Sequence, residues 1–265
     1  MNVTLPKRPK GQKRRIAKYI CVIIICILAI LVAVYQFFAD EKLEVILGLA
    51  KTEDEKIETL KTEFDGIFTN QPNEFVYTEY EKKENSLNDY DLNVNIPYIN
   101  IDNNEVKKHN EEMKKLFGNV AESILQTKGR NIVYSVNYMS EINNNILSVV
   151  IRSNIKEGNS AQRTIIQTYN YNIEKNEEVK LTDLLEYKNI EKNVAEDKIK
   201  EEIKKAQTQA TELKNLGYNI YNRNATDAIY KLENTTEFFI YSDRIYIIYA
   251  YGNQEVTSEM DIIIL

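Results

Sequence analysis

Cysteine and histidine are almost missing from this sequence of 265 residues, and their scarcity excludes several kinds of chemistry. Cys21 and Cys26 both lie in one apolar run, and His109 is the only histidine. After that run no disulfide framework and no thiol nucleophile is available. A zinc site of the usual His/Cys kind needs more ligands than one histidine provides, and His109 falls at the edge of a predicted helix stripe without a triad partner. We therefore expect no enzyme activity, no metal and no cofactor.

Carboxylates are plentiful, but their spacing does not indicate a catalytic pair. Glu111-Glu112 and Glu201-Glu202 are adjacent on predicted helices, and adjacent helical side chains point in different directions. Glycoside hydrolysis needs two acids that face each other across a cleft. These acids alternate with lysines, so we interpret them as solvated helix faces. The phosphate-loop, calcium-loop and dinucleotide motifs are also absent from the sequence.

Glycine and proline are scarce, at 8 and 4 residues, and tryptophan is absent, which argues against a linker-dominated chain. Acidic residues are missing before Asp40. The first 18 residues instead carry seven positive charges, on Lys7, Arg8, Lys10, Lys13, Arg14, Arg15 and Lys18. Subtracting these seven charges from the net charge of −6 leaves −13 on the remainder. We expect no nucleic-acid partner, because so acidic a region is unsuited to binding phosphates.

The apolar run from Tyr19 to Phe38 has twenty residues and no charge. That length matches a hydrocarbon layer of roughly 30 Å when the run is helical. The basic flank precedes the run, so the positive-inside rule predicts a cytoplasmic segment 1–18, a transmembrane helix 19–38 and an extracytoplasmic remainder. The residues after the run offer no good cleavage site, and Cys26 follows isoleucines rather than the small residues of a lipoprotein site. We predict an uncleaved signal anchor in the cell membrane.

Residues 39–90 are predicted to be a helical stalk and linker. A helix is expected over 52–68, with Thr52 and Glu55 as a capping box. This helix is either a stalk or a partner-binding element. Residues 69–90 read as loop with one strand near 75–80, and the folded domain is expected over 91–265.

The domain 91–265 is predicted to be α+β, with two long helices packed on one face of an antiparallel sheet. The first helix is capped by Asp102 and stops near Gly129, and the second spans 188–215 with Gly217 as its C-cap. A short helix is expected near 225–232. The expected strands are 92–101, 132–138, 146–153, 165–173, 179–181, 238–241, 245–251 and 260–265.

Tyrosine is unusually common, at 18 residues. Four of these tyrosines could form an aromatic ligand surface on the strands, namely Tyr169, Tyr171, Tyr249 and Tyr251. Tyrosine is also an ordinary strand residue, with an apolar ring and a polar hydroxyl that can reach solvent. Both readings stay open at this point.

Three stretches resemble a known domain family. They are 168–172 leading into 179–185 (TYNYN and VKLTDLL), the hairpin 238–248, and Tyr249-Ala250-Tyr251-Gly252 followed by a final strand. Together they are similar to the extracytoplasmic domain shared by the anti-sigma factor RsiV and the peptidoglycan deacetylase PdaC, over about residues 90–265. Relatives often carry a histidine-containing turn where this chain has Glu157 to Gln162. A ligand role for that turn is therefore not carried over.

The resemblance implies a non-catalytic domain, since the deacetylase activity belongs to a separate domain with a histidine-dependent metal site. We expect a binding or sensing module at the bacterial cell envelope, with a protein or peptidoglycan ligand. One alternative is a structural partner in a membrane complex. An anti-sigma factor is a weaker alternative, because about 18 cytoplasmic residues are fewer than the roughly 40 that fold unaided. A carboxylate enzyme acting on an envelope polymer is a further class to be tested.

Overall fold

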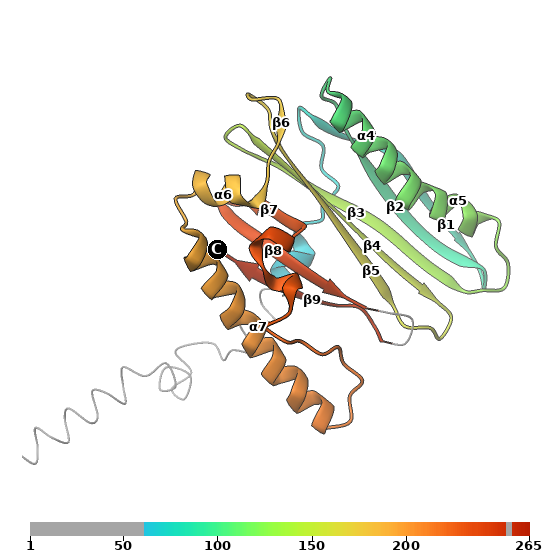
Figure 1. Ribbon diagram of the computed structural model, residues 1–265. Helices are drawn as coiled ribbons and strands as arrows, with labels where there is room; N and C mark the ends of the chain where they lie inside the picture. The colour runs from blue at the N-terminus through green and yellow to red at the C-terminus, as the bar shows by residue number, and fades with distance from the viewer. Residues whose placement is uncertain (1–60, 253–255) are drawn as a thin grey trace, which may run out of the picture. The chain divides into compact units, whose positions relative to one another are not determined.

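The computed structural model describes residues 61–252 and 256–265 (Figure 1). The predicted basic segment, the predicted span 19–38 and the capping box at Thr52 lie outside these ranges. Within the described ranges, no helix is long and apolar enough to cross a membrane. Glu63 to Leu265 forms one compact unit, and it is α+β with a large, mostly antiparallel sheet.

The larger sheet has six strands in the order of the chain. They are β1 (Val76–Ser86), β2 (Tyr90–Ile99), β3 (Ile132–Asn143), β4 (Ile146–Glu157), β5 (Arg163–Asn172) and β6 (Glu177–Glu178). All neighbours are antiparallel except β2 and β3. The turns after β3 and after β4 have left-handed backbone at Asn144 (φ 54°) and Gly158 (φ 50°).

The parallel pair β2–β3 is joined by a helical crossover, as parallel strands require. The crossover consists of α4 (Asn104–Met113), a π-helical turn η1 (Lys114–Gly118) and α5 (Asn119–Leu125). Asn103 caps α4 by accepting a hydrogen bond from the Glu105 amide, so the predicted cap Asp102 was wrong by one residue. Val106, Met113 and Phe117 bury the predicted stripe against β2 to β5.

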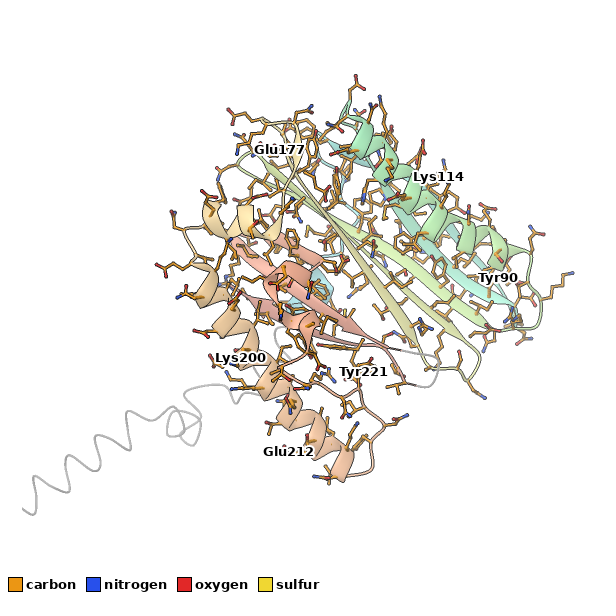
Figure 2. The ribbon with its side chains drawn as sticks, in the orientation of Figure 1. Tyr90, Lys114, Glu177, Lys200, Glu212 and Tyr221 are labelled. Atoms are coloured by element: carbon orange, nitrogen blue, oxygen red, sulfur yellow. The ribbon has the colours of Figure 1, made fainter. Side chains whose placement is uncertain are left out.

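The smaller sheet consists of β7 (Glu237–Tyr241), β8 (Arg244–Tyr251) and β9 (Glu259–Ile264). Its first hairpin turns at Ser242 and Asp243, which both have positive φ. On its outer side lie α6 (Leu181–Tyr187) and α7 (Lys192–Asn215), and two 3-10 turns follow, η2 (Ala228–Tyr230) and η3 (Leu232–Asn234). Figure 2 shows Lys200 and Glu212 on α7, and both residues are solvent-exposed.

Two predictions in this region were wrong. The expected strand 179–181 is absent, because Asp183 accepts a hydrogen bond from the Lys180 amide and starts α6 at Leu181. The expected helix 188–215 is shorter, since α7 begins at Lys192. Gly217 does end α7, with φ of +91° and its amide bonded to the Lys214 carbonyl.

The arrangement of layers also differs from the prediction of two helices on one face of a single sheet. The α4–α5 helix covers one face of the six-stranded sheet, whereas α6 and α7 cover the three-stranded sheet (Figure 1). The remaining faces of the two sheets meet in a third cluster that contains Met139, Val150 and Ile166 with Phe239 and Tyr246. The long helices therefore serve two different cores.

The domain begins earlier than residue 91. Residues 61–66 are helical, and Phe64 is buried between the sheets together with Ile67. β1 lies within the range 39–90 that was expected to be stalk and linker, yet it pairs with β2 from Val76 to Ser86. Only the first part of β1 coincides with the strand expected near 75–80, because residues 81–86 are mostly charged.

Candidate functional site

Tyr169 and Tyr171 lie on β5 beneath α4, so the sheet face that carries them is covered. They are 6% and 0% exposed. His109 of α4 stacks on Tyr169 with ring centroids 4.2 Å apart, and burial lowers the pKa of His109 to about 4 despite the nearby Glu112. The Tyr171 hydroxyl donates to Asn176 Oδ1 at 2.7 Å. The Tyr169 hydroxyl is buried and has no hydrogen-bond partner in the described part of the chain.

Tyr249 and Tyr251 lie on β8 in the other core, at 3% and 8% exposure. Tyr249 shares a hydrogen bond of 3.0 Å with Thr235. Tyr251 donates to Asp261 at 2.9 Å and shares a hydrogen bond of 2.8 Å with Tyr230. The four predicted tyrosines therefore belong to two separate cores, and the interpretation of these residues as one exposed ligand surface was wrong.

A buried ionic cluster surrounds Tyr251. Arg223, whose side chain is 7% exposed, forms ion pairs with Glu259 and with Asp261, the latter at 3.0 Å. Its guanidinium lies 4.7 Å from the Tyr251 ring centre. Tyr221 (labelled in Figure 2) stacks on the Tyr251 ring with centroids 5.1 Å apart. Burial opposes the charge of Arg223, but the bonds and charges of Asp261 and Glu259 outweigh it and raise its pKa. This cluster fastens the segment after α7 to β8 and β9.

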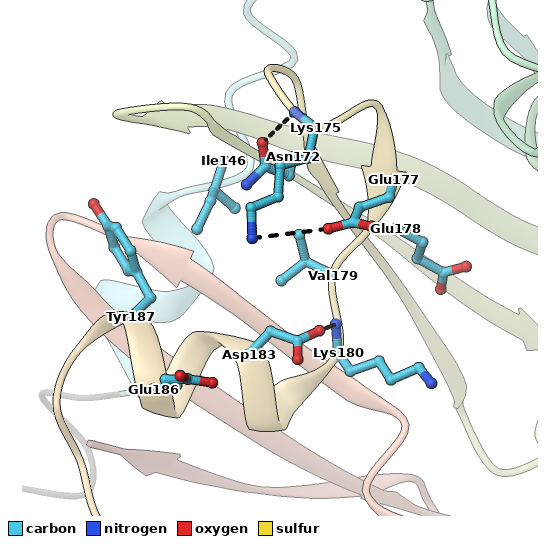
Figure 3. Close-up of a pocket in the computed structure, with 10 residues that line it drawn as sticks. All are labelled: Ile146, Asn172, Lys175, Glu177, Glu178, Val179, Lys180, Asp183, Glu186 and Tyr187. Carbon is cyan, nitrogen blue, oxygen red and sulfur yellow. Dashed lines mark hydrogen bonds and ion pairs between the residues drawn. The ribbon is translucent and has the colours of Figure 1, made fainter.

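A hollow in the described surface lies elsewhere, where the end of β5 turns through β6 into α6 (Figure 3). It has a volume of about 550 Å³. Its lining residues are Ile146, Asn172, Lys175, Glu177, Glu178, Val179, Lys180, Asp183, Glu186 and Tyr187. Most of them fall in the stretch 168–185 that carries the family resemblance.

Local hydrogen bonds fix the shape of this hollow. Asn172 Oδ1 accepts from the Lys175 amide at 2.9 Å, which closes the turn between β5 and β6. Asp183 holds the start of α6 through the Lys180 amide at 2.8 Å. At the other rim, the Tyr187 hydroxyl contacts Asn144 and Asn143 of the β3–β4 turn. The turn, the helix and the hairpin are therefore held in one arrangement around the opening.

The hollow carries both signs of charge on a small apolar floor. Two lysines and four acidic residues line it, and Ile146 with Val179 forms the apolar part. Lys175 pairs with Glu177 at 3.9 Å, and Figure 3 shows Glu177 turned toward Lys175 while the neighbouring Glu178 points away. Tyr187, at the rim, is 39% exposed. Such a surface can bind a polar ligand by ion pairs, hydrogen bonds and contact with one aromatic ring.

A second hollow of about 530 Å³ lies beside the N-terminal end of the compact unit. It is lined by Glu63, Gly66 and Ile67 together with residues of the β7–β8 hairpin. No cluster of three or more histidine, cysteine or acidic ligands for a metal ion occurs in the ranges that the structure describes. His109 is half-buried on α4 against Tyr169 and contributes to neither hollow.

Sequence reasoning missed both the hollow and the ionic cluster. One signal was available for the hollow, because most of its lining residues fall within the stretch 168–185, which carries the resemblance. Arg223 gave no signal, since its acidic partners are 36 and 38 residues away in the chain.

Comparison with known proteins gives a limited result. No family model matches the chain, and no curated protein matches it. Among solved structures, a DUF3298 family member from Bacteroides fragilis has 12% identity and a TM-score of 0.34, covering 64% of this chain and 79% of its own. A DUF3298 family protein from Pseudomonas aeruginosa has 8% identity and a TM-score of 0.35, covering 72% of this chain and 90% of its own.

Proposed function

We propose that this chain is a single-pass membrane protein whose extracytoplasmic domain is a non-catalytic binding module at the bacterial cell envelope. The hollow between β5, β6 and α6 is its ligand site, and the ligand is an envelope protein or peptidoglycan. The observation that carries this proposal is the fixed arrangement of mixed charges around Ile146 and Tyr187. The apolar run 19–38 and its basic flank support the anchor, and the resemblance of 168–185 supports the envelope location.

The chemistry of the hollow suits a ligand that carries both amino and carboxylate groups. Lys175 and Lys180 can pair with carboxylates, while Glu177 and Glu186 can pair with amines. Peptide stems of peptidoglycan and loops of envelope proteins both present these groups. Tyr187 offers an exposed ring on which a sugar or an aliphatic side chain can pack.

Binding is tested with the full-length chain in lipid nanodiscs, presented separately with insoluble peptidoglycan and with lysozyme. We expect one of the two probes to be retained. Lys175→Glu with Lys180→Glu should weaken an acidic ligand at least tenfold, and Glu177→Gln with Glu186→Gln should weaken a basic one. Lys83→Glu is the matched control, because Lys83 is exposed on β1 at the other edge of the sheet. If neither probe binds, or if all variants bind like the parent, the ligand assignment is wrong.

Topology is tested separately with single cysteines in a Cys21→Ser, Cys26→Ser background. Leu87 is 85% exposed, so Leu87→Cys should react with a membrane-impermeant maleimide in intact cells. Asn2→Cys should react only after lysis. The reverse labelling pattern would show the opposite orientation, and labelling of neither site before lysis would place the domain inside the cell.

A further inference from the structure

Each of the two sheets ends in two edge strands, and most of these edge strands are protected against pairing with another strand. The strand order places β1 and β6 at the edges of the larger sheet and β7 and β9 at the edges of the smaller one. β1 has a register shift between Thr78 and Tyr80 and carries Lys82 and Lys83. Charges and bulges of this kind discourage edge-to-edge association.

The exposed part of β5 beyond β6 is blocked by side chains. The Thr168 amide donates to Glu237 Oε2 at 2.7 Å, and the Thr164 amide donates to Ser258 Oγ at 3.0 Å. The Asn170 carbonyl accepts from the Val179 amide at 2.9 Å. The outward backbone groups at these positions are therefore occupied within the chain.

β7 is protected in a similar way, by the face of the larger sheet. Its outward amides belong to Phe238, Ile240 and Ser242. They donate to Thr168 Oγ1 at 3.1 Å, Ser148 Oγ at 3.1 Å and Glu141 Oε1 at 2.8 Å, respectively. The Phe238 carbonyl also accepts from Asn170 Nδ2 at 2.7 Å. No further strand can pair at β7 without breaking these bonds.

β9 differs from these edges. Leu265 and Ile245 exchange both backbone hydrogen bonds. In the antiparallel register of β8 and β9, the backbone N–H and C=O groups of odd-numbered β9 residues therefore bond to β8, and those of even-numbered residues point away from β8. Met260, Ile262 and Ile264 are these outward residues. Their backbone groups have no hydrogen-bond partner among the described residues, and their side chains are partly exposed. The strand EMDIII has no lysine and no proline, and its register with β8 runs without a shift.

We propose that β9 is a self-association edge, where it pairs antiparallel with β9 of a second copy of this chain around Ile262. The sequence of the strand is complementary to itself in this register. Ile262 faces Ile262 of the second copy, Met260 faces Ile264, and the acidic side chains of Glu259 and Asp261 face Leu265 and Ile263. A parallel pairing would instead place each acid opposite its own copy, which is unfavourable.

The acidic side chains of β9 already have a cationic partner within the chain. Glu259 and Asp261 already pair with Arg223 on the side of α7. Met260, Ile262 and Ile264 point to the other side, next to the cluster between the sheets. Pairing would therefore satisfy the outward backbone groups and cover three partly exposed apolar side chains. The assembled unit would contain the two small sheets joined into one.

The full-length chain in detergent should have the protein mass of a dimer by light scattering at micromolar concentration. Ile262→Lys should halve that mass, whereas Ile165→Lys, the same exchange at a 37% exposed site on β5, should leave it unchanged. Circular dichroism and thermal unfolding confirm that each variant is folded. A monomeric parent, or a dimeric and folded Ile262→Lys variant, would overturn the proposal.

Cysteine cross-linking tests the register and does not depend on a disruptive substitution. In the Cys21→Ser, Cys26→Ser background, Ile262→Cys places the two Cα atoms about 5.5 Å apart, within the range of a disulfide. Ile264→Cys places its own copies four residues out of register, about 13 Å along the strand. We expect mild oxidation to cross-link Ile262→Cys and not Ile264→Cys. Equal cross-linking at both sites, or none at Ile262→Cys, would contradict the proposed pairing.

Discussion

The two helix-covered cores of this domain are closed in different ways. Under α4 and α5 the contacts are almost entirely apolar and aromatic, and the one buried hydroxyl without a partner in the described structure, that of Tyr169, belongs to this core. Under α7 the closure depends on buried Arg223 and Tyr251 and on the partly buried Asp261, which are joined by ion pairs and hydrogen bonds. The first core is built from elements that follow one another in the chain, whereas the second joins the segment after α7 to the last strand.

This difference determines how the stability of each core responds to substitution. Apolar packing tolerates small changes if volume is kept. A buried charge network loses its balance when one member is removed. We therefore expect the removal of buried polar side chains to cost more in the core under α7 and at the junction of the sheets than in the core under α4.

The largest effect is expected for Arg223→Met. Its removal leaves Glu259 and Asp261 without their cation, and breaking a buried pair costs about 3–5 kcal/mol. Urea unfolding of the full chain in detergent, followed by tyrosine fluorescence, measures the loss. Arg130→Met removes an ion pair whose side chains are 55% and 41% exposed and should cost less than about 1 kcal/mol. Equal losses of unfolding free energy in the two variants would mean that the buried ion pairs of Arg223 stabilise the fold no more than an exposed ion pair does.

A smaller loss is expected for Asn170→Ala at the junction of the sheets. Asn170 accepts from Ser148 at 2.6 Å and donates to the Phe238 carbonyl at 2.7 Å, and it is 2% exposed. Leaving buried groups unpaired costs about 1–3 kcal/mol. Asn154→Ala on the same pair of strands removes only a bond to Thr164. Hydrogen exchange should show faster exchange of β7 amides in the first variant, and unchanged β7 protection would argue against the junction.

Two tyrosine-to-phenylalanine exchanges compare satisfied and unsatisfied hydroxyls in the core under α4. Tyr138→Phe removes bonds to Thr78 and to the Asn70 carbonyl, and should cost about 1–2 kcal/mol. Tyr169→Phe removes a buried hydroxyl with no described partner, and should be neutral or slightly stabilising. Thermal unfolding of the two variants ranks them directly. A costly Tyr169→Phe would show that this hydroxyl has a partner in solution.

The last predicted effect is on the pH dependence of stability, through His109. Its pKa is about 4 when folded, below the value of about 6.5 in an unfolded chain. The folded state is therefore disfavoured as pH falls below about 6.5, and this contribution levels off below the folded pKa. Between pH 7 and pH 5.5 the loss should reach about 1 kcal/mol. His109→Phe, compared by urea unfolding at both pH values, should remove this part of the dependence; an identical dependence would place His109 in solvent.

Local patterns in the sequence predicted most elements because their signals lie within a few residues. The pair Ser242-Asp243 indicated the β7–β8 turn, and Gly217 predicted the end of α7. Alternation of apolar residues predicted β3, β4, β7 and β8. The abundance of asparagine also has a structural use that its composition did not reveal. Six described asparagines have positive φ, where they serve the left-handed turns that glycine would otherwise occupy.

Long-range choices were not predictable from those signals. Periodicity shows which residues of a strand lie on the same face as Tyr169 or Tyr249. It does not show whether a helix covers that face or which sheet the strand belongs to. The same limit hid the division into two sheets, since β7 joins the larger sheet through side chains rather than through a strand ladder.

The hollow between β5, β6 and α6 is the feature on which the proposed function depends, and cross-linking in living cells tests it most directly. A photo-reactive amino acid at Tyr187, on the rim, should give an ultraviolet-dependent adduct with an envelope protein or with peptidoglycan. The same residue at Tyr218, which is 63% exposed and lies away from the hollow, should give none. Adducts from Tyr218 but not from Tyr187, or none from either, would contradict a ligand site in this hollow.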